Sequence, residues 1–249
     1  MKEPRSYGWK NVIYNSYCEL PENIQTFDNL EWINKQKKII ENYDSMHEND
    51  KEVLIQRNKM LIEYTKLIEK DEITILDFGG GLGTSYLPLA DSTSKRVDYH
   101  IVETPGLSST AMDYYAEKQL INFYSTIPQD LKSIDIVYIR TSLQYCEEWQ
   151  NILKSLFNLD SSYFLMAHLS AGNIPTYLTL QLWGNYEIPY WFINKGEIKR
   201  IAEQKNYICI DEHKSYNMKN DTGWSTYQHF PDKYRLEQLS NIVFKKRRM

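Results

Sequence analysis

The 249-residue chain lacks an apolar run long enough to cross a lipid bilayer, since the longest, residues 163–167, falls far short of the roughly 20 residues required. Its first ten residues also lack the apolar core of a signal peptide. Cysteine is scarce: Cys18, Cys146 and Cys209 lie far apart and are odd in number, which argues against a disulfide scaffold and a zinc knuckle. We therefore expect free thiols, a cytosolic location and no stable membrane insertion.

Excess positive charge is missing as well. The chain carries 29 basic and 33 acidic residues, a net charge of -4, and its only basic cluster is residues 245–248. Nucleic-acid binders attract phosphates through a net basic surface, so we expect no nucleic-acid partner. With 42% apolar and 14% aromatic residues, the composition is typical of a globular protein with one large core or two small ones.

The first 70 residues show helical rather than strand-like periodicity. Apolar residues recur at helical spacing from 50 to 68, and more weakly from 30 to 43, while Asn49 and Asp50 offer an N-cap for the second helix. A short strand is expected only at 12–14. We predict that residues 1–70 form a helical N-terminal cap.

From Glu72 onward, short β-rich runs alternate with helix-length polar segments. Five such runs predict an open, mostly parallel α/β sheet. They are residues 73–78, 99–103, 121–125, 134–139 and 163–169.

The rest of the chain predicts two more strands, 207–212 and 240–246, which can pair as a hairpin that closes one sheet edge. Before them come an aromatic-rich insertion at 169–193 and a helix from Asn194, and the connection at 213–239 is unusually long. The expected class is a Rossmann-like α/β fold at 71–249, with a seven-stranded sheet and helices on both faces.

The most informative segment is residues 75–85, ILDFGGGLGTS, where a buried strand runs into four glycines and then a helix. Glycines let the backbone approach a ligand closely, and doubly wound sheets bind ligands at the carboxyl ends of their strands. We expect Asp77 and the glycines to line a cofactor site. These glycines are Gly79, Gly80, Gly81 and Gly83.

The glycine spacing separates two cofactor classes. The nicotinamide dinucleotide fingerprint G-x-G-x-x-G would need glycine where Thr84 stands, whereas D-x-G-x-G-x-G fits without a gap. This pattern resembles motif I of class I S-adenosylmethionine-dependent methyltransferases. A strand-end carboxylate suits a ligand with an ammonium group and disfavours a pyrophosphate. A nicotinamide-dependent oxidoreductase or epimerase remains the alternative, although no suitably placed Tyr-x-x-x-Lys pair is present.

Glu103 ends the second predicted strand, where an acidic residue of such folds accepts hydrogen bonds from ribose hydroxyls. In the methyltransferase resemblance it holds the ribose of S-adenosylmethionine. Thr104, Thr141 and Tyr145 follow strand ends and complete the expected cofactor site. No acidic or amide adenine contact is evident after the third strand, at residues 125–126.

The resemblance extends over nearly the whole chain. Trp9 and the aromatic-rich segment after it, LDFGGGLGTSY at 76–86, SLQYCEEW at 142–149, Gln181 and IPYWFIN at 188–194 look like a family assigned as methyltransferases in bacterial gene clusters for surface polysaccharides such as lipopolysaccharide and capsule. It implies methylation of a sugar hydroxyl on a nucleotide sugar or a glycan precursor.

Methyl transfer depends chiefly on orientation, which can supply about 7 to 11 kcal/mol, against roughly 3 to 5 kcal/mol from a general base. His168 is the first candidate base, expected to titrate near working pH, and His229 is the second. Arg140 ends an apolar strand and is expected to form an internal ion pair. Arg57 is expected on a solvated helix face, with a contact to the methionine carboxylate as the alternative.

Aromatic faces with polar tips suit a sugar acceptor, and the predicted acceptor contacts are Gln181, Tyr190 and Trp191. No pattern indicates a metal site. Because neither candidate base belongs to a fixed catalytic motif, a non-catalytic cofactor-binding subunit of a glycan-synthesis complex is a further alternative. The sequence does not assign an oligomeric state.

Overall fold

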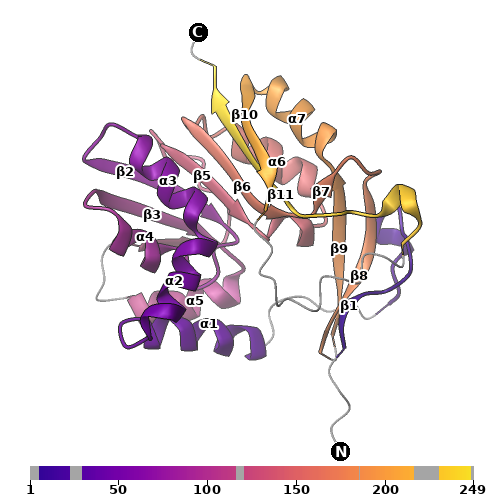
Figure 1. The fold of residues 1–249 in the computed structure, drawn as a ribbon, viewed down its shortest axis with the longest axis horizontal. Helices are drawn as coiled ribbons and strands as arrows, with labels where there is room; N and C mark the ends of the chain where they lie inside the picture. Colours follow the sequence, from indigo (N-terminus) through magenta and orange to yellow (C-terminus); the bar gives the residue numbers. More distant parts are fainter. Residues whose placement is uncertain (1–5, 23–29, 116–120, 185, 216–229, 248–249) are drawn as a thin grey trace, which may run out of the picture.

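The computed structural model describes residues 6–22, 30–115, 121–184, 186–215 and 230–247 (Figure 1). Seven strands form one sheet in the order β10-β11-β6-β5-β2-β3-β4. All neighbours from β6 to β4 are parallel, so the predicted mostly parallel α/β sheet is confirmed. The bounds are β2 Glu72–Phe78, β3 Arg96–Val102, β4 Ile121–Tyr124, β5 Ile136–Arg140, β6 Tyr163–Leu169, β10 Tyr207–Lys214 and β11 Ser240–Lys246.

Apolar cores cover both faces of this sheet, which explains why its central strands are almost continuously apolar. On one face, Leu76 packs in a core with Leu153 and Ile198 from two helices. On the other face, Ile75 packs in a core with Leu61 and Leu107. The helices that contribute are α3 Lys59–Leu67, α4 Tyr86–Ser92, α5 Pro105–Tyr115, α6 Trp149–Phe157 and α7 Lys195–Gln204.

The predicted edge hairpin is also confirmed, because β10 and β11 pair antiparallel and β11 pairs antiparallel with β6. Helix α7 begins as expected: the Asn194 side chain caps it by accepting a hydrogen bond from the Gly196 N–H at 2.8 Å. Its Ile198, Ile201 and Ala202 are buried, as predicted.

The aromatic-rich insertion forms a second sheet, which the sequence pattern did not predict. Strands β8 Tyr177–Gly184 and β9 Tyr186–Asn194 pair antiparallel, flanked by β1 Ser6–Trp9 and β7 Ala171–Gly172. Both hairpin faces are covered, one by Trp9 and one by the main core, so no polar alternation marks the strands. The strand expected at 12–14 is wrong: only Tyr14 makes a bridge, to Leu178. In Figure 1 this small sheet lies to the right of the large one.

The N-terminal helices differ from expectation in two respects. Helix α1 Leu30–Asn42 matches the predicted segment, but the helix expected over 50–68 is divided into α2 Glu48–Arg57 and α3. The division falls at the buried Asn58, whose side-chain amide donates to the Leu54 carbonyl at 2.9 Å and ends α2. The N-cap position of α2 is His47, not Asn49 or Asp50.

The cysteines at 18, 146 and 209 are free, as expected. Among the described residues, no helix combines the length and apolar character needed to span a bilayer.

Candidate functional site

The glycine loop after β2 has a backbone that only glycine adopts readily. Gly79, Gly81 and Gly83 have φ values of 71°, 59° and 82°. A Cβ on Gly79 would lie 2.2 Å from the Cβ of Ser142, whose hydroxyl donates to the Phe78 carbonyl at 2.6 Å. The missing side chain at 79 therefore lets the segment after β5 approach the end of β2.

Glu103, directly after β3, faces the same loop. Its carboxylate accepts hydrogen bonds from the Gly81 N–H at 3.0 Å and from the Thr104 N–H at 2.8 Å. The side chain is partly exposed. The ends of β2 and β3 thus form one edge with a fixed carboxylate beside the glycine backbone, as the sequence predicts.

Asp77 lies beneath this loop. It is 1% exposed, accepts the Tyr99 hydroxyl at 2.7 Å, and would lie 2.6 Å from a Cβ on Gly80. Burial raises the pKa of Asp77 to about 7, opposed by the Tyr99 hydrogen bond and the Arg140 charge, while the Glu103 charge adds to the rise. The carboxyl therefore ionises more readily once a cation arrives at this edge.

We expect Asp77→Asn to be more stable than the parent above pH 7, by roughly 1 to 4 kcal/mol. The folded protein binds the Asp77 proton more tightly than the unfolded chain does. Protonation of Asp77 therefore stabilises the fold at low pH, and this stabilisation is lost as pH rises through about 7. The asparagine amide oxygen still accepts the Tyr99 hydroxyl. Denaturant unfolding at pH 5 and pH 8 measures the effect, with exposed Asp71→Asn as the control. An advantage equal at both pH values would contradict it.

At the ends of β5 and β6 lie two non-glycine residues with left-handed backbones, Thr141 at φ 55° and His168 at φ 52°. Such conformations cost about 1 to 3 kcal/mol and tend to cluster at functional sites. The His168 backbone N–H donates to Asn241 Oδ1 at 2.9 Å, and its Nδ1 lies 2.9 Å from the Ser215 hydroxyl. These contacts hold the imidazole ring at the carboxyl edge of the sheet.

The electrostatic setting of His168 differs from the sequence expectation. Desolvation, together with the charges of Arg140 and Arg57, lowers its pKa to about 3. The ring is therefore neutral at physiological pH, but it does not titrate near working pH as expected. It is a weak base in this environment.

The ion pair expected for Arg140 is not present among the described residues. Its charge acts on Asp77 and on His168, and its Nε is buried without a hydrogen-bond partner. Arg57, in the last turn of α2, contributes charge to the same region, as its effect on His168 shows.

The predicted acceptor residues separate into two groups. The Tyr145 hydroxyl, in the short helix η2 Leu143–Tyr145, donates to Gln181 Oε1 at 2.8 Å, and its ring meets Tyr190 edge to face at 5.0 Å. Tyr190 is fully buried and its hydroxyl contacts that of Ser170. Trp191 faces the opposite side of the hairpin and packs in the main core.

The second candidate base, His229, lies outside the described residues.

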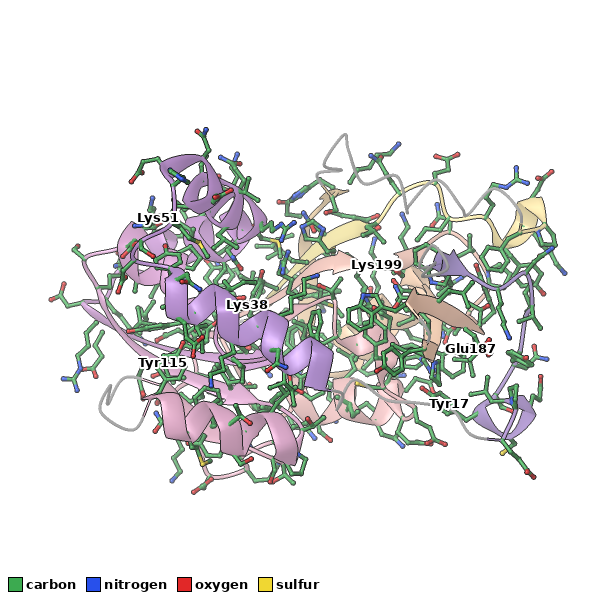
Figure 2. The ribbon with its side chains drawn as sticks, turned by 90° about the horizontal axis from the view of Figure 1, so that it is seen from below. Tyr17, Lys38, Lys51, Tyr115, Glu187 and Lys199 are labelled. Carbon is green, nitrogen blue, oxygen red and sulfur yellow. The ribbon has the colours of Figure 1, made fainter. Side chains whose placement is uncertain are left out.

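Helix α1 contributes a residue that the sequence analysis missed. Gln36 is 8% exposed, and its Oε1 would lie 3.0 Å from a Cβ on Gly81. The Tyr115 hydroxyl of α5 would lie 3.3 Å from a Cβ on Gly83, so α1 and α5 flank the loop. Figure 2 shows the two helices beside each other, marked by Lys38 and Tyr115. A polar residue in the apolar stripe between Trp32 and Ile40 was the available signal.

A second missed residue is Gln144, in η2. It is fully buried and its side chain interacts with the Tyr190 hydroxyl, although neither amide atom reaches good hydrogen-bonding geometry with a described residue. An amide that is only weakly satisfied inside the protein would gain from further hydrogen bonds at this position beside Tyr145 and Tyr190.

No family model matches the chain, and no curated protein matches it in sequence. Solved structures do match its fold. A chain in the complex between the Haloferax volcanii Trm112 methyltransferase activator and its assigned methyltransferase gives a TM-score of 0.58 at 14% identity, over 90% of this chain and 96% of that one. Magnesium protoporphyrin IX methyltransferase from Synechocystis PCC 6803, with bound S-adenosylhomocysteine, gives 0.55 at 13%, over 89% and 97%.

A further match is the S-adenosylmethionine-dependent methyltransferase of Clostridium acetobutylicum, with a TM-score of 0.50 at 13% identity, over 86% of this chain and 98% of that one. At such identities the likeness shows the fold alone. The chain therefore has the Rossmann-like methyltransferase fold, as the sequence predicted.

Proposed function

We propose that the protein is an S-adenosylmethionine-dependent methyltransferase. The observation that carries this proposal is the edge where the Glu103 carboxylate is fixed beside the N–H of Gly81, at the carboxyl end of the first parallel strand. Two acidic groups, Asp77 and Glu103, suit a cationic cofactor and disfavour one with a pyrophosphate. The glycine spacing and the methyltransferase fold of the structural neighbours support the same cofactor.

The residues present fit this cofactor. The glycine backbone allows a nucleoside to approach, the partly exposed Glu103 carboxylate is an acceptor of the kind that ribose hydroxyls bind, and Thr104 lies beside it. Thr141 and Tyr145, after β5, are proposed to line the methionine side. When bound, S-adenosylmethionine would supply a methyl group on a sulfonium. The acceptor oxygen would bond to the methyl carbon as the carbon–sulfur bond breaks, so that the thioether leaves and the hydroxyl proton passes to a base.

The acceptor is proposed to be a sugar hydroxyl of a nucleotide sugar or glycan precursor in surface-polysaccharide biosynthesis. The sequence resemblance supports this, as do the polar Gln181 and the stacked, partly exposed rings of Trp183 and Tyr186. Gln181 and Tyr190 would shape this end of the site. Buried Trp191 would support the hairpin from its other face.

His168 is proposed to accept the acceptor proton, with His229 as the second candidate. Its ring lies at the end of β6, next to the strand that carries Thr141. The contacts to Ser215 and Asn241 fix the ring's position, so its contribution includes orientation as well as basicity.

We expect calorimetric titration to show binding of S-adenosylhomocysteine and none of NAD, because the loop follows the methyltransferase spacing and has Thr84 in place of the third dinucleotide glycine. Tight NAD binding without any response to S-adenosylhomocysteine would overturn the proposal in favour of an oxidoreductase. Incubation with labelled S-adenosylmethionine and a panel of nucleotide sugars then tests transfer itself.

Replacing Glu103 with alanine should weaken S-adenosylhomocysteine binding by about 10- to 150-fold, because a charged acceptor for two ribose hydroxyls is lost. The matched control is Glu72→Ala, at the opposite end of the sheet, where the side chain is 58% exposed. Calorimetry on both variants measures the difference. Affinity within twofold of the parent for Glu103→Ala would place ribose recognition elsewhere.

A further inference from the structure

Arg140 occupies the centre of the carboxyl edge, between two neighbouring strands. It ends β5, which pairs with β2 on one side and with β6 on the other, so it lies between Asp77 and His168. Arg140 is partly exposed, but its Nε is buried without a hydrogen bond, and it forms no ion pair within the described ranges. A partly desolvated guanidinium of this kind is stabilised when an anion joins it.

Asp77 does not fill that role in the structure. Its carboxyl lies beneath Gly80, and one oxygen accepts the Tyr99 hydroxyl. The Arg140 charge only partly offsets the burial of this carboxyl, whose pKa stays near 7. An anion that arrives with a ligand would therefore compensate the Arg140 charge better than Asp77 does.

Resting on the proposed function, we propose that Arg140 binds an anionic group of the methyl acceptor, a carboxylate or phosphate, beside His168. The acceptor is favoured as the source of this anion because Arg140 pairs across the sheet with the end of β6, which carries the proposed base His168, and lies apart from the nucleoside edge of Glu103 and Gly81. The methionine tail, which Thr141 after β5 would line, is the competing source, and the first experiment below tests it. The acceptor class is thus an acidic sugar or a sugar phosphate.

Such an anion would also improve the base. Within the part of the chain that the structure describes, His168 is influenced or contacted by Arg140 from β5, Arg57 from α2, Ser215 after β10 and Asn241 from β11, none of which is acidic. An anion on Arg140 offsets one of the two positive charges that lower the pKa of His168. Proton acceptance is then favoured only when the acceptor is in place.

The first experiment asks whether the anion belongs to the cofactor. The variant is Arg140→Gln, with exposed Arg96→Gln as the matched control. Calorimetry compares S-adenosylhomocysteine with 5′-methylthioadenosine, which lacks the amino-acid tail and its carboxylate. We expect the preference for S-adenosylhomocysteine over 5′-methylthioadenosine to be the same in the parent, Arg140→Gln and Arg96→Gln. A preference that falls tenfold or more in Arg140→Gln alone would assign Arg140 to the cofactor tail and overturn the proposal.

The second experiment tests the acceptor anion directly. Protein saturated with S-adenosylhomocysteine is titrated with glucuronate, inorganic phosphate and glucose at constant ionic strength, followed by NMR. We expect glucuronate and phosphate to bind the parent and Arg96→Gln, and to bind Arg140→Gln about 10- to 150-fold more weakly. Glucose should not distinguish the variants. Anion binding that is absent, or equal in the parent and Arg140→Gln, would overturn the proposal.

Two further measurements keep the outcomes distinct. The anion titrations are repeated without nucleoside. If the protein binds no S-adenosylhomocysteine, the proposed function is contradicted, but these titrations still measure whether Arg140 binds an anion. Arg140→Lys keeps the charge and loses the fork of donors, so its anion affinity should fall between those of the parent and Arg140→Gln. This variant also serves if Arg140→Gln does not fold.

Discussion

Gly79→Ala is expected to abolish S-adenosylhomocysteine binding and to lower the free energy of unfolding by about 2 to 6 kcal/mol. The new Cβ would meet the Cβ of Ser142 at 2.2 Å, in a backbone held at φ 71°. Left-handed strain of about 1 to 3 kcal/mol and overpacking of about 1 to 3 kcal/mol act together here. Denaturant unfolding and calorimetry measure the two losses.

Gly81→Ala should abolish binding with a smaller loss of stability, about 1 to 2 kcal/mol, since its Cβ meets only the flexible end of Gln36 at 3.0 Å. The control is Gly106→Ala, where nothing lies within 4 Å of the added carbon and φ is not positive. If Gly81→Ala binds with the affinity of the parent, the loop has another purpose. If Gly79→Ala is as stable as the control, the packing against Ser142 is not required.

The parts of the fold that the sequence predicts are those whose signal is local. Ile75 and Leu76 belong to a short, continuously apolar run, which a strand buried on both faces requires. The Asn194 cap and the inward Ile198 likewise follow from spacing alone. The division of α2 from α3 at Asn58 was missed because a single asparagine does not break an otherwise helical pattern.

The small sheet was missed for a physical reason. Tyr190 and Trp191 are adjacent on β9 and point to opposite faces, yet both are buried, one against Trp9 and the other in the main core. The polar alternation that marks a half-exposed strand is therefore absent. The interpretation of these residues as a shared sugar-binding surface could not be separated from core packing without knowing what covers each face.

The candidate site shows the same limit. Glycine spacing and the place of Glu103 after a strand are sequence features, and the structure brings them together. The properties of His168 and Arg140 depend instead on their neighbours across β5 and β6 and on Arg57 from α2, far away in sequence. The burial and the neighbouring positive charges that lower the pKa of His168 come from tertiary packing, which no local sequence pattern predicts.

His168→Ala is expected to leave S-adenosylhomocysteine affinity nearly unchanged and to lower the methylation rate by about 10² to 10⁴, if this ring accepts the acceptor proton. The ring lies at the end of β6, away from the nucleoside edge at β2 and β3. His47→Ala, at the start of α2, is the control. Initial rates with labelled S-adenosylmethionine and calorimetry separate catalysis from binding.

The pH profile tests the same assignment more sharply. With a pKa of about 3 in the free protein, His168 stays neutral through the neutral range, so kcat/KM should show no histidine limb between pH 5 and 8. If an acceptor anion on Arg140 raises that pKa, kcat should rise with pH at the lower end of the range, and His168→Ala should lose this limb. A variant that methylates at the parent rate would remove His168 from the mechanism and leave His229 or orientation alone. A parent protein that binds the cofactor yet methylates no acidic sugar, sugar phosphate or nucleotide sugar would favour a non-catalytic cofactor-binding subunit.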